Sequence, residues 1–100
     1  MHPSIASHRP ELAALCRRFA VRRLELFGSA ARDGGEPRDV DFLVEFAPLP
    51  PGQHAPAYFG LLAALEDLLG RPVDLVMTEG VRNRRFLEAI AGERVLLHAA

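Results

Sequence analysis

Residues 39–46, DVDFLVEF, alternate between two kinds of side chain along their whole length. Successive side chains of a β-strand point to opposite faces, so this period of two predicts a strand. One face would be apolar and pack into a core, and the other would carry acid. The apolar set is Val40, Phe42, Val44 and Phe46, and the other set is Asp39, Asp41, Leu43 and Glu45.

The segments before this strand differ from one another in character. Residues 10–20 place apolar side chains at helical spacing, which predicts a helix. Residues 21–27, VRRLELF, are rich in branched and aromatic side chains and predict a strand that ends in a tight turn at Gly28. We expect a short helix from Ser29, followed by an exposed connection over residues 33–38, DGGEPR.

The segments after this strand continue the alternation of strands and helices. Residues 47–56 contain four prolines and are expected to be a loop rather than a helix or strand. From Tyr58 to Leu69 an apolar stripe predicts a long helix, and Gly70 then supplies a stop signal. The remaining segments are expected to be a strand at 73–77, a helix at 83–91 and a strand at 94–97. This order predicts an α+β fold, with a small mixed sheet and helices on one face.

Length and composition limit what the chain can do. With 100 residues, 49% of them hydrophobic, we expect a single domain over residues 1–100. The net charge of −1 provides no overall positive field to attract nucleic acid. The lone Cys16 excludes an internal disulfide and fits the core of the first helix. No stretch resembles a membrane span or signal peptide, so we expect a soluble, cytoplasmic protein with no membrane partner.

Asp39 and Asp41 are the first candidates for a functional site. Two apart on a strand, they share a face, with Cα atoms about 6.5–7 Å apart. A divalent cation would turn the repulsion between these carboxylates into attraction, and oxygen ligands favour Mg²⁺ or Mn²⁺. If the strand at 73–77 lies alongside, Asp74 would complete a three-carboxylate cluster of the kind that nucleotidyl transfer uses. Alternatively, these acids form the polar face of an ordinary half-exposed strand.

The turn after residues 21–27 is the second candidate. Gly28 would allow close approach of the backbone to a phosphate, and backbone N–H groups together with the Ser29 hydroxyl would bind it. Arg32 would add a charge-assisted contact. The alternative is a turn glycine, an N-capping serine and a surface cation.

Taken together, GSAARDGGEPRDVDFLVEF at residues 28–46 and GRPVDLV at residues 70–76 are similar to the signature of the minimal nucleotidyltransferases. These are small antitoxin-like members of the DNA polymerase β nucleotidyltransferase superfamily. The resemblance implies a polymerase-β-like fold that uses Mg²⁺ and ATP. It also implies a role for each motif residue. Gly28 and Ser29 would cradle the triphosphate, Asp39 and Asp41 would bind metal, and Asp74 would join them and help to deprotonate the acceptor hydroxyl.

The chain departs from the family pattern in two places. Nine residues separate Ser29 from Asp39, where about ten are common, and Arg38 replaces a small polar residue. Arg38 would either pair with Asp39 or contact phosphate. These departures leave open a second hypothesis, a binding module that blocks its partner without catalysis.

The resemblance also implies a partner. Members of this size commonly neutralise a helical HEPN-domain RNase toxin, in some systems by adding AMP to a tyrosine of the toxin. We therefore expect a toxin-directed protein adenylyltransferase that forms a hetero-oligomer with its HEPN partner. A third hypothesis is transfer of a nucleotide to a small molecule or an RNA end, which the absence of a basic surface disfavours.

Overall fold

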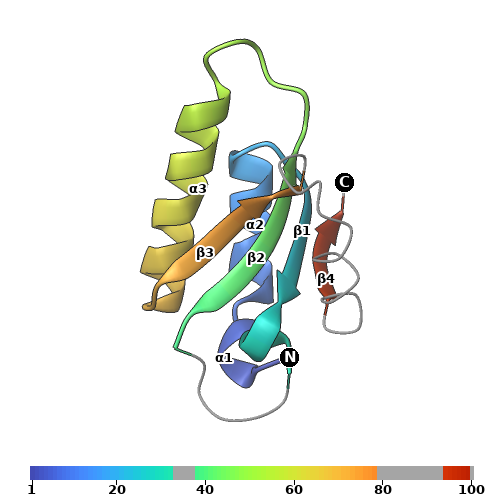
Figure 1. Cartoon of the computed structure of the whole chain (residues 1–100), viewed down its shortest axis with the longest axis vertical. Coiled ribbons are helices and arrows are strands. Elements are labelled where there is room, and N and C mark those ends of the chain that lie inside the picture. The colour runs from blue at the N-terminus through green and yellow to red at the C-terminus, as the bar shows by residue number, and fades with distance from the viewer. Residues whose placement is uncertain (33–37, 79–93, 100) are drawn as a thin grey trace.

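A computed structural model describes residues 1–32, 38–78 and 94–99 of the chain (Figure 1). Its helices and strands follow in the order α1 (Pro3–Ala6), α2 (Arg9–Arg18), β1 (Val21–Phe27), the 3-10 turn η1 (Gly28–Ala31), β2 (Val40–Phe46), α3 (His54–Leu69), β3 (Val73–Met77) and β4 (Val95–Ala99).

The four described strands form one mixed sheet in the order β3-β2-β1-β4. β1 pairs antiparallel with both β2 and β4, whereas β2 and β3 run parallel. The parallel pair requires a crossover, and α3 provides it, as is usual for parallel neighbours. The predicted small mixed sheet is therefore confirmed.

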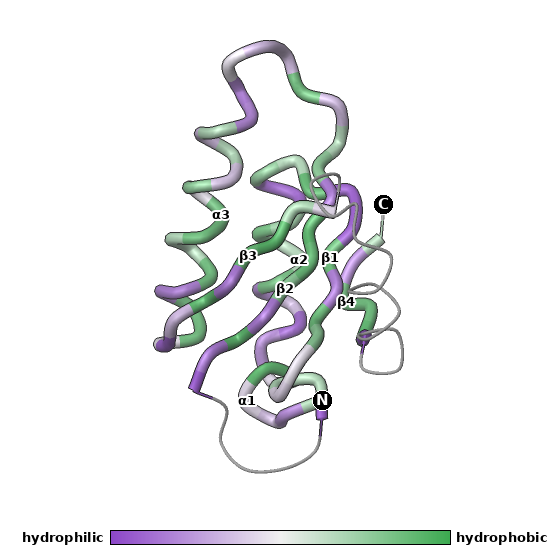
Figure 2. Tube along the Cα trace, viewed as in Figure 1, coloured by the Kyte–Doolittle hydropathy of each residue, from purple (hydrophilic) through white to green (hydrophobic). Residues whose placement is uncertain are grey.

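Helices α2 and α3 cover one face of this sheet, and β2 and β3 pass in front of them in Figure 1. The main core lies between the two layers. It takes one side of β2, and the pattern of green along that strand in Figure 2 follows the alternation in its sequence. Its buried members on the strands and long helices include Leu12, Cys16, Leu24, Leu26, Val40, Phe42, Val44, Leu61 and Leu65. A smaller apolar cluster of Phe27, Leu43 and Val76 lies on the other face.

The start of α3 corrects the loop expected over residues 47–56. The helix begins at His54, so it contains Pro56 in its first turn. The first four N–H groups of a helix have no carbonyl partner within it, so a proline there removes no helical hydrogen bond. At its other end, α3 stops at Gly70, whose φ of +66° is the left-handed conformation that favours glycine.

Other bounds agree with the sequence to within a few residues. α2 covers Arg9–Arg18 rather than 10–20, and β4 covers Val95–Ala99 rather than 94–97. The short helix α1 was not predicted. The helix expected at 83–91 lies outside the described residues. Within the described part of the chain, none of the helices is long and apolar enough to cross a membrane.

Candidate active site

Asp41 and Asp74 lie side by side on the two parallel strands. The register pairs Asp41 of β2 with Asp74 of β3, and it pairs Phe27 of β1 with Asp41 on the other side. Paired residues project from the same face of a sheet. The two carboxyl groups lie within hydrogen-bonding reach of each other on the face opposite to the helices.

The surroundings of Asp41 disfavour its charged form. Burial has the largest effect, followed by the hydrogen bond and negative charge of Asp74 and then the charge of Asp39. Together these raise the pKa of the Asp41 carboxyl above its ordinary value. A cation bound between the acids would reverse the effect of their mutual repulsion.

Asp39 is placed differently from the other two. It lies one residue before β2, is exposed, and acts on Asp41 through its charge. No group of three or more Asp, Glu, His or Cys side chains is arranged to hold a metal ion, as far as the described residues extend. Arg38 is exposed as well, and no ion pair joins it to Asp39, both being residues that the structure describes.

Gly28 brings the turn after β1 directly against Asp41. Its φ of +73° is in the left-handed region, and a Cβ built on it would collide with Oδ2 of Asp41. Two independent constraints therefore select glycine at this position, namely the backbone conformation and the close approach of the carboxylate. The predicted glycine turn and the predicted acid pair are parts of one site.

The N-terminal residues of the chain contact the rest of the turn. The backbone N–H of His2 donates to the carbonyl of Ala30 at 2.9 Å. Ser29 and Arg32 are both exposed, and the Arg32 N–H donates to the Ser29 carbonyl at 3.3 Å. The side chain of Ser29 does not cap the turn, whose N-cap residue is Phe27 with no side-chain hydrogen bond.

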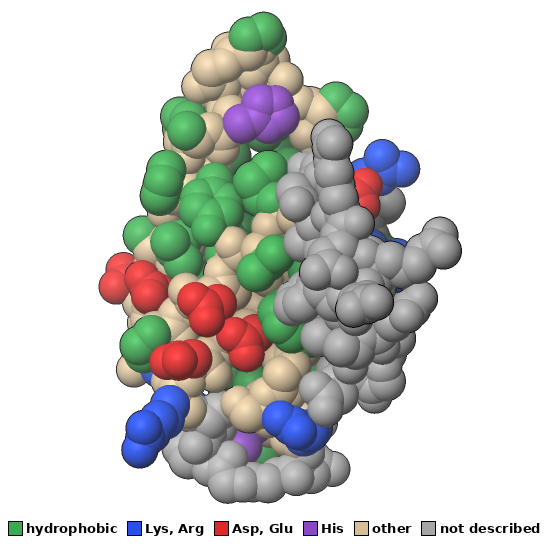
Figure 3. Space-filling model, viewed as in Figure 1, with side chains coloured by type: hydrophobic (Ala, Val, Ile, Leu, Met, Phe, Trp, Pro, Cys, Tyr) green, Lys and Arg blue, Asp and Glu red, His purple; other side chains and the backbone are tan. Residues whose placement is uncertain are grey.

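A pocket of about 480 Å³ opens beside the two carboxylates. Its lining comes from β1, β2, β3 and α3, namely Phe27, Asp41, Tyr58, Leu62, Val73, Asp74, Leu75 and Val76. Figure 3 shows acidic side chains gathered on this face, where β2 and β3 begin, with apolar side chains next to them. An apolar pocket with a few convergent polar groups is the usual form of a ligand site.

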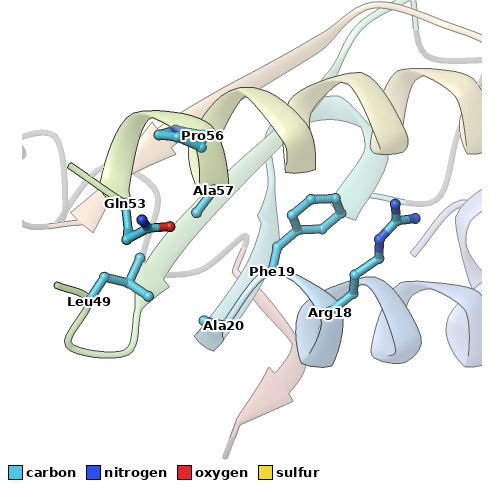
Figure 4. A pocket seen from close by; sticks show the side chains of 7 residues that line it. All are labelled: Arg18, Phe19, Ala20, Leu49, Gln53, Pro56 and Ala57. Atoms are coloured by element: carbon cyan, nitrogen blue, oxygen red, sulfur yellow. The ribbon is translucent and has the colours of Figure 1, made fainter. Parts of the chain in front are cut away.

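A second hollow, of about 280 Å³, lies where the end of α2 meets the start of α3 (Figure 4). The ring of Phe19 fills the space against α3, and Arg18 lies over this ring at 5.0 Å from its centre. This hollow contains no carboxylate. Its described lining therefore offers no anionic ligand for a metal ion and no carboxylate to accept a proton, and we do not assign the chemistry to it.

The donor set beside the pocket suits a hard divalent cation. Carboxylate oxygens are the preferred ligands of Mg²⁺ and Mn²⁺, and zinc sites usually contain nitrogen or sulfur. The mutual repulsion of Asp41 and Asp74 would be relieved by such a cation. These residues therefore fit the metal that the resemblance implies.

Comparison with known proteins identifies the family. The sequence model of the nucleotidyltransferase domain family matches residues 12–97 of the chain. The chain belongs to the nucleotidyltransferase domain family. The predicted enzyme class, a nucleotidyltransferase, is thereby confirmed, and the matched range contains every predicted site residue.

Relatives of this nucleotidyltransferase agree with that assignment. It is 39% identical over 70 residues to a protein from Methanocaldococcus jannaschii named "putative protein adenylyltransferase", covering 69% of this chain and 68% of that one. It also resembles a solved structure described as a "putative minimal nucleotidyltransferase". That match has a TM-score of 0.74 and 32% identity and covers 95% of each chain.

More distant likeness extends to toxin–antitoxin structures. One is a tri-AMPylated Shewanella oneidensis HEPN toxin in complex with MNT antitoxin, with a TM-score of 0.66 and 20% identity over 95% of this chain and 72% of that chain. Another is a toxin–antitoxin structure with AMP-PNP, with a TM-score of 0.69 and 20% identity over 92% and 73%. At this level of identity the likeness shows the fold, which is the minimal nucleotidyltransferase fold.

The sequence did not single out three residues that make specific contacts, two of them between α3 and β3 and one elsewhere on the sheet. Tyr58 was assigned only to the apolar stripe of α3, but its hydroxyl donates to the Leu75 carbonyl at 2.6 Å. Glu66 accepts a hydrogen bond from the Val73 N–H at 3.1 Å. Glu25 is 3% exposed and pairs with Arg23 and Arg94. Of these contacts, strand periodicity signals only the one between Arg23 and Glu25, which are two residues apart on β1. The others join different elements, so no local pattern signals them.

Proposed function

We propose that this nucleotidyltransferase transfers AMP from ATP to a hydroxyl group of a partner protein, in a reaction that depends on Mg²⁺. The observation that carries the proposal is the juxtaposition of Asp41, Asp74 and Gly28 at one end of the sheet. The sequence relative named as a protein adenylyltransferase supports the choice of a protein acceptor.

Each residue has a distinct role in this proposal. The backbone of Gly28 and Ser29, together with the Arg32 side chain, binds the triphosphate. Asp39, Asp41 and Asp74 would hold the metal ions, and Mn²⁺ would serve in place of Mg²⁺. Such ions, when bound, neutralise charge on the triphosphate and lower the pKa of the attacking hydroxyl.

The transfer balances without any further reactant. The acceptor oxygen forms a bond to the α-phosphorus of ATP, and the bond from that phosphorus to the bridging oxygen of the β-phosphate breaks. Pyrophosphate leaves with the electron pair. The proton of the acceptor hydroxyl passes to the Asp74 carboxylate, which lies at the pocket beside Asp41.

We further propose that the acceptor is a tyrosine of a HEPN-domain RNase toxin, which the transfer neutralises in the cytoplasm, within a complex of the two proteins. The distant structural likeness to MNT antitoxins in toxin–antitoxin complexes supports this choice. No direct binding of nucleic acid is proposed, because the net charge of −1 provides no general attraction for phosphate backbones.

The direct test is the intact mass of the toxin after incubation with this protein, ATP and Mg²⁺. We expect a gain of one or more AMP masses, lost when Mg²⁺ is chelated and lost in Asp41→Asn. Glu45→Gln is the matched control, because Glu45 lies on the same face of β2 but outside the pocket. An unchanged toxin mass, or an equal gain with Asp41→Asn, would refute transfer at this site.

A binding-only antitoxin is the second candidate function, favoured by the exposed Arg38 at the position where the family has a small polar residue. In that case, inhibition of the toxin RNase would survive the double substitution Asp39→Asn and Asp41→Asn. Labelled-nucleotide transfer to RNA ends or small molecules in the absence of toxin would instead support the third hypothesis.

A further inference from the structure

Strand β3, which carries Asp74, lies at an edge of the described sheet. It pairs with β2 on one side, and β3 ends the strand order on the other. An edge strand has a row of backbone groups without a strand partner, so its position is less firmly fixed than that of a central strand. Asp74 must nevertheless stay opposite Asp41 for the two carboxylates to act together.

Two side chains of α3 bind the backbone of β3 on either side of Asp74. The carboxylate Oε2 of Glu66 accepts a hydrogen bond at 3.1 Å from the N–H of Val73, which precedes Asp74. The hydroxyl of Tyr58 donates a hydrogen bond at 2.6 Å to the carbonyl of Leu75, which follows Asp74. Along a strand, the backbone N–H and C=O groups of successive residues point to alternate sides. The groups of Val73 and Leu75 therefore point away from β2, whereas those of Asp74 point toward it. The two contacts therefore hold the outer edge of β3 at the residues next to Asp74.

The geometry of α3 makes this arrangement possible. Tyr58 and Glu66 are eight residues apart, which is about 2.2 helical turns, so their directions around the helix differ by about 80°. This difference is small enough for both side chains to contact β3. The rise between them is about 12 Å, which exceeds the distance of about 7 Å between Val73 and Leu75. The side chains of Tyr58 and Glu66 are long enough to span this difference, since both contact β3.

We propose that Tyr58 and Glu66 are positioning residues that lock β3 in the register at which Asp74 meets Asp41. The inference rests on the proposed function for the role of Asp74, but the locking itself is a property of the fold. A different reading is that the two side chains merely occupy edge groups that would otherwise pair with a second chain. The two readings differ in what happens at Asp74 when a contact is removed.

Tyr58→Phe tests one contact by removing the hydroxyl and keeping the ring. Glu66→Ala tests the other, and Glu66→Gln keeps an oxygen that can accept from Val73. The measurement is Mn²⁺ affinity by electron paramagnetic resonance on the full chain, without nucleotide. We expect binding about ten-fold weaker in Tyr58→Phe and Glu66→Ala, in the range usual for residues that orient metal ligands, and near wild type in Glu66→Gln.

Two neighbouring positions on α3 provide matched controls. Phe59→Leu changes an aromatic residue that is 63% exposed, and Asp67→Ala removes an exposed acid next to Glu66. Both are expected to bind Mn²⁺ as the wild type does. Wild-type affinity in Tyr58→Phe and Glu66→Ala, or an equal loss in the controls, would overturn the proposal.

Amide hydrogen exchange in the metal-free protein tests the locking independently of any metal. We expect the amides of β3 to exchange about ten-fold faster in Tyr58→Phe and Glu66→Ala, with those of β1 unchanged. Unchanged exchange in β3 would overturn the proposal. If the toxin gains no AMP mass with the wild-type protein but β3 exchanges faster in the variants, the proposed function fails and the locking of β3 stands.

Discussion

Asp41 is the residue at which stability and function are opposed. Its raised pKa means that the folded state binds more protons than the unfolded state between the ordinary and the raised pKa values, so stability falls as pH rises through this range. At neutral pH the ionised carboxylate therefore destabilises the metal-free fold. Carboxyl groups whose pKa is shifted in this way are common at functional sites.

Asp41→Asn is expected to abolish nucleotide transfer and to leave the melting temperature of the metal-free protein unchanged or raised at neutral pH. The gain should stay below about 1 kcal/mol, because Asp41 is only half-buried and solvent screens its charge. Thermal unfolding measured beside the transfer assay checks this. A clear loss of stability would mean that Asp41 serves the fold rather than the site.

Gly28→Ala is expected to cost more stability than Gly70→Ala, although both glycines have positive φ. Alanine in this conformation costs about 1–2 kcal/mol at either position. Apart from its own chain neighbours and helix backbone, no atom of the described residues lies within 4 Å of a Cβ at Gly70, whereas at Gly28 the Cβ would meet the Asp41 carboxylate. The measurement is urea unfolding of both variants, with ATP affinity in the presence of Mg²⁺. Equal costs at the two glycines, with normal ATP affinity in both, would disprove the link between the turn and Asp41.

At the scale of secondary-structure elements, Glu25 joins β1 to the residue before β4. Its carboxylate accepts hydrogen bonds from Arg94, where Nη2 lies 3.0 Å from Oε1, and from Arg23. The hydrogen bond from Arg94 contributes most to lowering the pKa of Glu25 and, with the help of Arg23, outweighs the opposing effect of burial. The folded state therefore favours the ionised form.

Glu25→Gln is expected to destabilise the fold by about 1.5–3 kcal/mol at neutral pH. Because the folded pKa of Glu25 is lowered, its contribution is full above the ordinary carboxyl pKa and is lost as pH falls through the folded value. The difference between wild type and variant should therefore shrink as the pH falls below the ordinary carboxyl pKa. Urea unfolding across this range measures it.

The matched control for Glu25→Gln is Glu45→Gln. Glu45 lies 3.6 Å from Arg22, in a pair whose side chains are 30% and 61% exposed. Such surface pairs contribute about 0–1 kcal/mol, so this variant should change little. Equal effects at the two positions would show that the Glu25 cluster is no stronger than an ordinary surface pair.

At the scale of the whole molecule, ligand binding should stabilise the fold. Any ligand that binds the native state alone adds to the free energy of unfolding, by about 2.7 kcal/mol at one hundred times its dissociation constant. ATP with Mg²⁺ is expected to raise the melting temperature of the wild type, and a chelator should remove most of this rise. Asp41→Asn should show little response. A shift that persists in the chelator would place the nucleotide at a site independent of metal.

The sequence could predict those parts of the fold that depend on local pattern. The alternation in residues 39–46 was sufficient to place Asp41 on a strand face opposite to the core, and Gly70 correctly predicted the end of α3. The predicted start of α3 was wrong, because proline is excluded from the interior of a helix but not from its first turn.

The sequence alone therefore determined which residues lie on strands and which face of β2 carries acid, since the period of side-chain direction is a local property of the backbone. Only the tertiary structure decided that Asp74 lies opposite Asp41, that Gly28 packs against the same carboxylate and that Tyr58 and Glu66 bind the backbone on either side of Asp74. Strand order and register arise from the packing of α2 and α3 on the whole sheet, and contacts of that range are not encoded in any short stretch of the chain.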